Sequence, residues 1–289
     1  MAPLIIKTSR LTRMYGSITG VSNLEIEIAE GESFGLIGPN GAGKTTTIRL
    51  LLGFIKPTSG FATVLGRNPG EPEILERIGY CPGEPAIYEH TTADRFFQLV
   101  GRIRGDRYYA SAAAWAKRFD LPLHRRILKL SRGNRQKVQL ICAIAHDPEL
   151  LILDEPFSGC DPPTRQMFME CIEQLIRGGS GVFIASHQLH DITRICTRVG
   201  FIDNGKLIED QHINELRRRM PHRIRISVPP EYTLHRQPGI ESCKKIAPGE
   251  YVIVTHAIGT LLKYLADLPV ISLDITSGGL EHLFLSNAK

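Results

Sequence analysis

The sequence contains one short stretch that strongly restricts the possible folds, the eight residues Gly38–Thr45. They read Gly-Pro-Asn-Gly-Ala-Gly-Lys-Thr and fit the pattern G-x-x-x-x-G-K-[ST]. An apolar strand, Phe34–Ile37, is expected before the stretch and a helix, Thr46–Leu52, after it, which is the context in which this pattern binds phosphate. Glycines let successive backbone N–H groups face one anion, and the positive end of the helix dipole points at the same anion. The alternative is an ordinary glycine-rich turn.

Two side chains of this loop are predicted to act on nucleotide phosphates. Lys44 is expected to reach the β and γ phosphates, and Thr45 is expected to offer its hydroxyl to Mg²⁺. The residues predicted to surround the phosphates are Gly38, Pro39, Asn40, Gly41, Ala42, Gly43, Lys44, Thr45 and Thr46.

Two carboxylates follow the apolar run 149–153, which is typical of a parallel strand buried on both faces. Ligands of open α/β sheets bind at the carboxyl ends of the strands, so Asp154 and Glu155 are expected beside the phosphate loop. Asp154 is predicted to hold Mg²⁺ through water. Glu155 is predicted to orient or deprotonate the attacking water. The alternative is a strand end at the surface without a catalytic role.

The length and composition are those of a globular protein with two domains. The chain has 289 residues, and roughly 100 to 200 residues make one domain. Its net charge of +5 is a mild basic excess that does not indicate nucleic-acid binding.

No apolar stretch approaches the roughly 18 to 20 residues that cross a bilayer, and the N-terminus lacks the pattern of a secretion signal. The cysteines show no metal-ligand spacing. These features predict a cytoplasmic protein.

Strands and helices alternate along the first part of the chain, which predicts an α/β fold with a largely parallel sheet. The other elements expected there are a strand with outward-facing glutamates over 24–30, helices over 91–145 and 167–176, a buried strand over 182–185 and a hairpin over 201–208. The pattern breaks around Arg217–Pro221. We therefore predict one domain over 1–215 and a small α+β domain over 216–289. The second has expected strands over 251–254 and 270–275 and short helices over 259–266 and 280–285.

Several further motifs stand in a fixed order in the first domain. Leu130–Gln136 reads Leu-Ser-Arg-Gly-Asn-Arg-Gln, Ser158–Asp161 follows the two carboxylates, and His187 follows the strand over 182–185. With Tyr15 and the phosphate loop, these motifs resemble those of the nucleotide-binding subunits of ABC transporters. The resemblance covers about residues 4 to 215.

The resemblance implies a P-loop NTPase core with an antiparallel β subdomain and a helical subdomain over about 83–148, and it implies hydrolysis of ATP with Mg²⁺ as cofactor. By the same resemblance, Tyr15 stacks on adenine, His187 contacts the γ-phosphate and Asp161 belongs to the D-loop. The signature residues that bind a second ATP across a head-to-tail dimer are Ser131, Arg132, Gly133 and Asn134. Without the other motifs, the residue types leave alternatives open. Tyr15 could be an aromatic residue of the core, and His187 could have only a structural role.

The sequence departs from the family pattern in two places. Arg132 and Asn134 stand where the commoner signature has Gly and Gln, and Arg132 adds a cation near the expected phosphates. Gly83 stands where the family has a Gln that contacts metal and water and couples to the membrane partner; the neighbouring Glu84 is a candidate replacement. This form resembles the subgroup that serves ABC-2-type exporters. The small C-terminal domain, whose sequence ends with the stretch 279–285, is also similar to the one that those subunits carry.

The partners implied by the resemblance are an integral membrane permease of the ABC-2 type and a second copy of the chain, at the inner face of the cell membrane. Segment Gly79–Thr92, with Ile87 and Tyr88, is the expected docking loop for the permease. No nucleic-acid partner is expected. The alternative function is a soluble ABC-type ATPase acting on the ribosome or nucleic acid. A GTPase or small-molecule kinase is less favoured, since no N-K-x-D motif occurs and 203–206 reads Asp-Asn-Gly-Lys.

Overall fold

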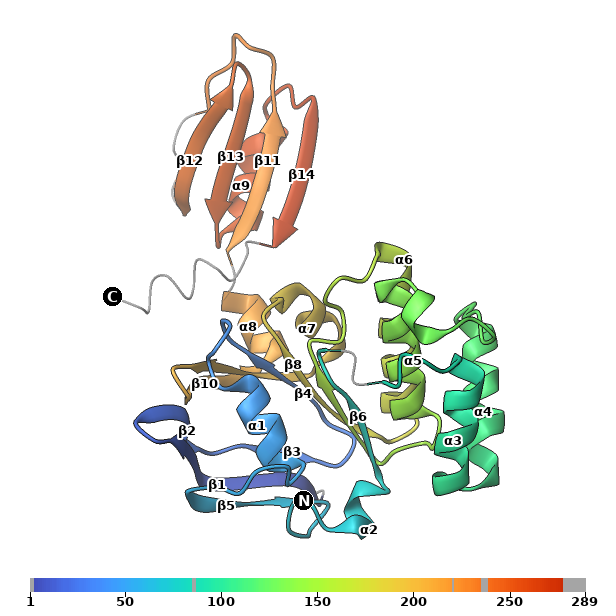
Figure 1. Cartoon of the computed structure of the whole chain (residues 1–289). Helices are drawn as coiled ribbons and strands as arrows, with labels where there is room; N and C mark the ends of the chain where they lie inside the picture. Colours follow the sequence, from blue (N-terminus) through green and yellow to red (C-terminus); the bar gives the residue numbers. More distant parts are fainter. Residues whose placement is uncertain (1–2, 85–86, 220, 235–238, 278–289) are drawn as a thin grey trace. The chain divides into compact units, whose positions relative to one another are not determined.

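A computed structural model of the chain describes residues 3–84, 87–219, 221–234 and 239–277. These residues form two compact units, the first ending at Ile213 and the second beginning at Asn214. Each unit encloses its own cluster of buried apolar side chains, so each is described by itself. Figure 1 traces the elements of both units along the chain.

The first unit is built on a mostly parallel sheet with the strand order β10-β9-β4-β8-β7-β6. Its strands are β4 (Ser33–Ile37), β6 (Ile78–Cys81), β7 (Leu150–Asp154), β8 (Gly181–Ser186), β9 (Arg198–Asp203) and β10 (Lys206–His212). β10 runs antiparallel to β9, and the other neighbours pair in parallel. β4, β7 and β8 are buried along their whole lengths, as expected for apolar strands with both faces covered. Their carboxyl ends therefore meet at one edge of the sheet.

Helices pack around this sheet and form a separate helical group beside it (Figure 1). The helices are α1 (Lys44–Leu51), α2 (Pro72–Leu75), α3 (Ala93–Arg104), α4 (Asp106–Arg118), α5 (Arg132–Ile144), α6 (Pro162–Arg177) and α7 (Leu189–Ile195), with a 3₁₀ turn at Ile127–Lys129. α3, α4 and α5 contact one another and occupy most of the stretch predicted to be helical. α1 begins at Lys44 rather than at the predicted Thr46, because the left-handed Gly43 directly precedes the helix. None of the described helices is both long and apolar enough to cross a membrane.

A second, antiparallel sheet completes the first unit. It contains β1 (Leu4–Tyr15), β2 (Ile18–Leu24), β3 (Glu27–Ala29) and β5 (Ser59–Val64). The predicted alternation over 24–30 is confirmed, since Leu24, Ile26 and Ile28 are buried and the three glutamates of this stretch are exposed. These residues do not form one strand, however, because β2 ends at Leu24 and β3 begins at Glu27. The sequence analysis missed β5, because Pro57-Thr58-Ser59-Gly60 reads as a turn. The strand forms there because it pairs with the distant β1.

The second unit is a four-stranded antiparallel sheet with one helix packed on it. The strands, in the order β12-β13-β11-β14, are β11 (His222–Ser227), β12 (Ile240–Ala247), β13 (Glu250–Thr255) and β14 (Ser272–Ser277). Leu261 and Leu265 of α9 (Ile258–Ala266) belong to the same buried cluster as Ile224 and Ile253 of the sheet. Helix α8 (Ile213–Arg219) continues into the first residues of the predicted break at 217–221 and ends within it. The helix predicted over 280–285 lies outside the described residues.

Candidate active site

The loop between β4 and α1 has the backbone conformation that its glycines permit. Gly41 and Gly43 have φ angles of 81° and 110°, in the region that other residues rarely adopt. A Cβ atom at Gly43 would also lie 2.5 Å from the carbonyl oxygen of Gly20. The loop therefore needs glycine at this position for two independent reasons, backbone angle and space.

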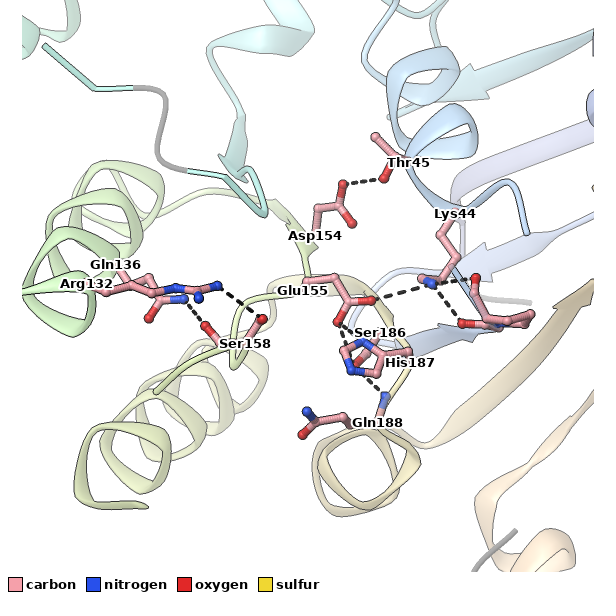
Figure 2. A network of polar contacts seen from close by, with 12 residues as sticks. Lys44, Thr45, Arg132, Gln136, Asp154, Glu155, Ser158, Ser186, His187 and Gln188 are labelled. Carbon is pink, nitrogen blue, oxygen red and sulfur yellow. Dashed lines mark hydrogen bonds and ion pairs between the residues drawn. The ribbon is translucent and has the colours of Figure 1, made fainter. Parts of the chain in front are cut away.

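The ammonium group of Lys44 lies inside this loop. Its Nζ donates hydrogen bonds to the carbonyl oxygens of Gly38, at 2.7 Å, and Pro39, at 3.0 Å. It also forms an ion pair with Oε1 of Glu155 at 3.5 Å, as Figure 2 shows. The residue is only 6% exposed. A positive charge is thus fixed at the position where the loop amides and the start of α1 favour an anion.

Thr45 and Asp154 join the loop to the end of β7. The Thr45 hydroxyl donates to Oδ2 of Asp154 at 2.8 Å. Asp154 is 5% exposed, and its other oxygen, Oδ1, is buried without a hydrogen-bond partner. Burial raises the pKa of this carboxyl, while the Thr45 hydrogen bond and the charge of Lys44 act in the opposite direction. A buried carboxylate oxygen without a partner, beside a hydroxyl, fits a hard cation or its bound water.

Glu155 is the centre of a polar network at the carboxyl ends of β7 and β8 (Figure 2). Its Oε2 lies 2.8 Å from Nδ1 of His187 and accepts a hydrogen bond from the Ser186 hydroxyl at 3.3 Å. The backbone φ of Glu155 is 47°, and its N–H donates to the carbonyl oxygen of Ala185. The parallel pairing of β7 with β8 thus brings together two residues, Glu155 and His187, that were predicted separately. The sequence analysis did not identify Ser186.

The predicted signature residues lie at the start of α5. Ser131 caps the helix, its hydroxyl accepting a hydrogen bond from the backbone N–H of Asn134 at 3.2 Å. Arg132 donates to the hydroxyl of Ser158 at 3.4 Å, and Asp161 stands directly before α6. Figure 2 shows Arg132 and Ser158 on the opposite side of Glu155 from Lys44. Within one chain, the signature and the phosphate loop are not brought together.

Tyr15 lies at the surface, at the end of β1. Its side chain is 40% exposed, so the alternative of a core aromatic is wrong. The guanidinium of Arg13 lies over the ring, 4.8 Å from its centroid. A Cβ atom at Gly20 would come within 2.8 Å of the ring edge, so the glycine gives the ring its place beside β2. A partly exposed aromatic ring can stack on a planar ligand.

Comparison with known proteins identifies the family. The family model described as ABC transporter matches residues 21–158. The bacitracin transport ATP-binding protein BcrA of Bacillus licheniformis is 39% identical over 220 residues, covering 74% of this chain and 72% of that protein. The uncharacterized ABC transporter ATP-binding protein YhaQ of Bacillus subtilis is 33% identical over 219 residues, covering 74% and 73%. The chain belongs to the ABC transporter ATP-binding proteins.

Solved structures agree with this family. The ATP-binding subunit of an ABC transporter, 27% identical, has a TM-score of 0.68 and covers 74% of this chain and 92% of that one. The dimeric cassette MJ0796 bound to ADP and phosphate, 21% identical, has a TM-score of 0.66, covers 72% and 98%, and shows the same fold. The predicted P-loop NTPase fold is confirmed. As an ABC ATP-binding protein, the chain is an ATP-binding and ATP-hydrolysing subunit.

This ABC protein departs from the commoner family sequence at Gly83, which lies directly beside the carboxylate strand. A Cβ atom at Gly83 would be 3.1 Å from the carbonyl oxygen of Asp154 and 3.6 Å from Cβ of Glu155. The next residue, Glu84, is exposed, and its carbonyl oxygen accepts a hydrogen bond from Gln139 at 3.1 Å. The backbone therefore approaches the candidate site at the position where the family has a glutamine.

Proposed function

We propose that this chain is the motor subunit of an ABC-2-type exporter. Two copies would bind two Mg-ATP head to tail, and their closure would move a separate membrane permease. The observation that carries the proposal is the division of the site. The phosphate loop with Asp154 and Glu155 forms one surface, and the signature at Ser131 and Arg132 forms another, so one chain offers two incomplete and different halves.

In the first half, the loop amides and Lys44 would bind the β and γ phosphates. Thr45 and Asp154 fit a Mg²⁺ site, because the threonine hydroxyl lies at the carboxylate and Oδ1 of Asp154 lacks a partner. Mg²⁺, when bound there, would neutralise charge that develops on the phosphates. Among the described residues, no three His, Cys, Asp or Glu side chains form a metal cluster, so phosphate oxygens and water would complete the coordination.

Glu155 would accept the proton of the attacking water. Its carboxylate is partly buried and is oriented by Ser186 and His187, which fixes the direction in which a water would be held. His187 is exposed, so its ring can also reach a γ-phosphate. In the second half, Ser131 and the first backbone N–H groups of α5 would bind the nucleotide of the other copy, with Asp161 at the dimer contact and Tyr15 stacked on adenine.

The transport function and the membrane partner are supported by the relatives. BcrA is named for bacitracin transport, and the described part of this chain has no helix that could cross a membrane. In this proposal, a separate permease contacts the chain at the inner face of the membrane. The proposed docking segment is Gly79–Thr92, whose residues 85–86 lie outside the description. Its Tyr88 is 70% exposed and packs edge-on against Phe96, with ring centroids 6.1 Å apart.

We expect Tyr88→Ala to weaken binding of the permease strongly while ATP binding by the isolated chain is unchanged. An aromatic residue anchored on one side and exposed on the other is typical of interface residues whose truncation costs about 2 kcal/mol or more. Co-purification with the membrane protein measures the effect. Phe61→Ala removes an exposed aromatic side chain of β5 and serves as the control. Equal recovery of the membrane protein with Tyr88→Ala and wild type would rule out this docking position.

The proposed function is tested by purifying tagged Glu155→Gln with Mg-ATP from detergent-solubilised membranes of the host. An integral membrane protein with several spans is the expected partner, because the variant should hold ATP without turning it over. Recovery of ribosomal or nucleic-acid partners instead would contradict the transporter proposal and favour a soluble ABC-type ATPase.

A further inference from the structure

The guanidinium of Arg132 lies on the D-loop of its own chain (Figure 2). Its Nη2 donates to the hydroxyl of Ser158 at 3.4 Å. A Cβ atom at Gly159 would lie 2.8 Å from both Cζ and Nε of Arg132, and Gly159 has a φ of 73°. The absence of a side chain at Gly159 is therefore what lets the guanidinium lie against the loop.

A second contact holds the same loop from the buried side of α5. Gln136, one turn after Arg132, donates through Nε2 to the carbonyl oxygen of Ser158, and its Oε1 accepts from Sγ of Cys160 at 3.2 Å. Gln136 is buried, whereas Arg132 is exposed. Of the two α5 side chains on the D-loop, only Arg132 is free to leave without disrupting the interior.

The partner that Arg132 has in this structure is a weak one for a full positive charge. Ser158 offers a neutral hydroxyl at the long end of hydrogen-bond distances. No ion pair of Arg132 occurs among the described residues. A phosphate is a much stronger partner for a guanidinium, because the hydrogen bonds are charge-assisted and can be bidentate. The D-loop follows Glu155 by only a few residues. Release of Ser158 by Arg132 would therefore change the backbone segment next to the proposed base.

We propose that Arg132 is a two-position arm that binds Ser158 of its own D-loop within the single chain, as seen here, and the γ-phosphate of ATP on a second copy in the closed pair. The inference rests on the proposed function, because it requires the signature of one copy to meet the nucleotide of the other. It adds a regulatory role. The contact with Ser158 opposes closure, and the γ-phosphate, which ADP lacks, displaces it. Arg132 would thereby connect the nucleotide on one copy with the catalytic segment of the other.

The two contacts of Arg132 can be distinguished by mutation. Loss of the contact with the γ-phosphate should weaken ATP-dependent dimerisation, whereas loss of the contact with Ser158 should strengthen it. In a Glu155→Gln background, we expect Arg132→Ala to raise the Mg-ATP concentration for half-maximal dimerisation about tenfold, as for loss of a charged hydrogen bond. Ser158→Ala should lower that concentration by about two- to fivefold, as for loss of a neutral hydrogen bond. In the double variant, Ser158→Ala should have no further effect, which is the signature of a direct coupling. Light scattering after size-exclusion chromatography measures dimer formation.

Arg125→Ala is the matched control, since it removes an exposed arginine of the same unit from the segment between α4 and α5. It should leave the ATP dependence unchanged, and melting temperatures should show that every variant folds. A shift by Ser158→Ala in the same direction as Arg132→Ala, or an undiminished effect of Ser158→Ala without Arg132, would overturn the two-position arm. If the Glu155→Gln parent itself forms no dimer with Mg-ATP, the proposed function fails first and the inference fails with it.

Discussion

Glu155→Gln is expected to bind Mg-ATP normally and to lower kcat for hydrolysis by about 10² to 10⁴-fold, the usual contribution of a general base. This corresponds to about 2.7 to 5.4 kcal/mol of transition-state stabilisation. The amide has the shape of the carboxylate and can still accept from Ser186, so the site should keep its geometry. It cannot take the proton of the attacking water. The variant should therefore accumulate in the ATP-bound dimer.

Phosphate release and equilibrium nucleotide binding, measured on the same preparation, separate these effects. Glu149→Gln is the matched control, because Glu149 directly precedes β7, at the end of the strand opposite Glu155, and pairs there with Arg77. It should retain the wild-type kcat. Full turnover by Glu155→Gln would remove Glu155 from the mechanism, and the network around His187 would then need another explanation.

Lys44→Ala is expected to raise the Kd for Mg-ATP by about 10- to 150-fold, from loss of a charged hydrogen-bond donor worth about 1.5–3 kcal/mol. Lys44 is buried and is held inside the loop by hydrogen bonds to Gly38 and Pro39, so its truncation removes the positive charge from the loop. The rate of ATP hydrolysis should fall in parallel with the affinity for Mg-ATP. The effect should be larger for ATP than for AMP, because the lysine would bind the outer phosphates.

Titration of the protein with a fluorescent ATP analogue measures this loss. Lys56→Ala removes the same charge from an exposed loop and should bind like the wild type. A melting temperature close to that of the wild type would show that the loop remains folded. Unchanged ATP affinity in a folded Lys44→Ala protein would contradict the assignment of the phosphate loop.

The parts of the site that are local in sequence were predictable. A strand, a glycine-rich loop and a helix follow one another directly, so the position of Lys44 needs no information from the rest of the chain. Asp154 was predictable for a different reason, since the carboxyl ends of parallel strands share one edge of the sheet. The structure places its carboxylate on Thr45, as that rule requires.

Contacts between distant segments were not predictable. β5 contains Gly60 at a φ of 74° and begins in a turn-like sequence, and only its pairing with β1 makes it a strand. β12 was missed as well, because it is an edge strand with two irregularities in its register and exposed lysines that hide its alternation. The contact of Arg132 with Ser158 spans 26 residues and depends on a glycine whose role appears only in three dimensions.

The position of Lys44 has a consequence for the speed and thermodynamics of nucleotide capture. The loop is held in its turned conformation by hydrogen bonds within the chain, from the ammonium group of Lys44 to the carbonyl oxygens of Gly38 and Pro39. Its backbone entropy is therefore lost when the protein folds, and not when ATP binds. Such a preorganised loop needs no slow rearrangement during association. The association rate of ATP should then be limited by encounter, and differences in affinity among loop variants should arise mainly from how fast the nucleotide leaves.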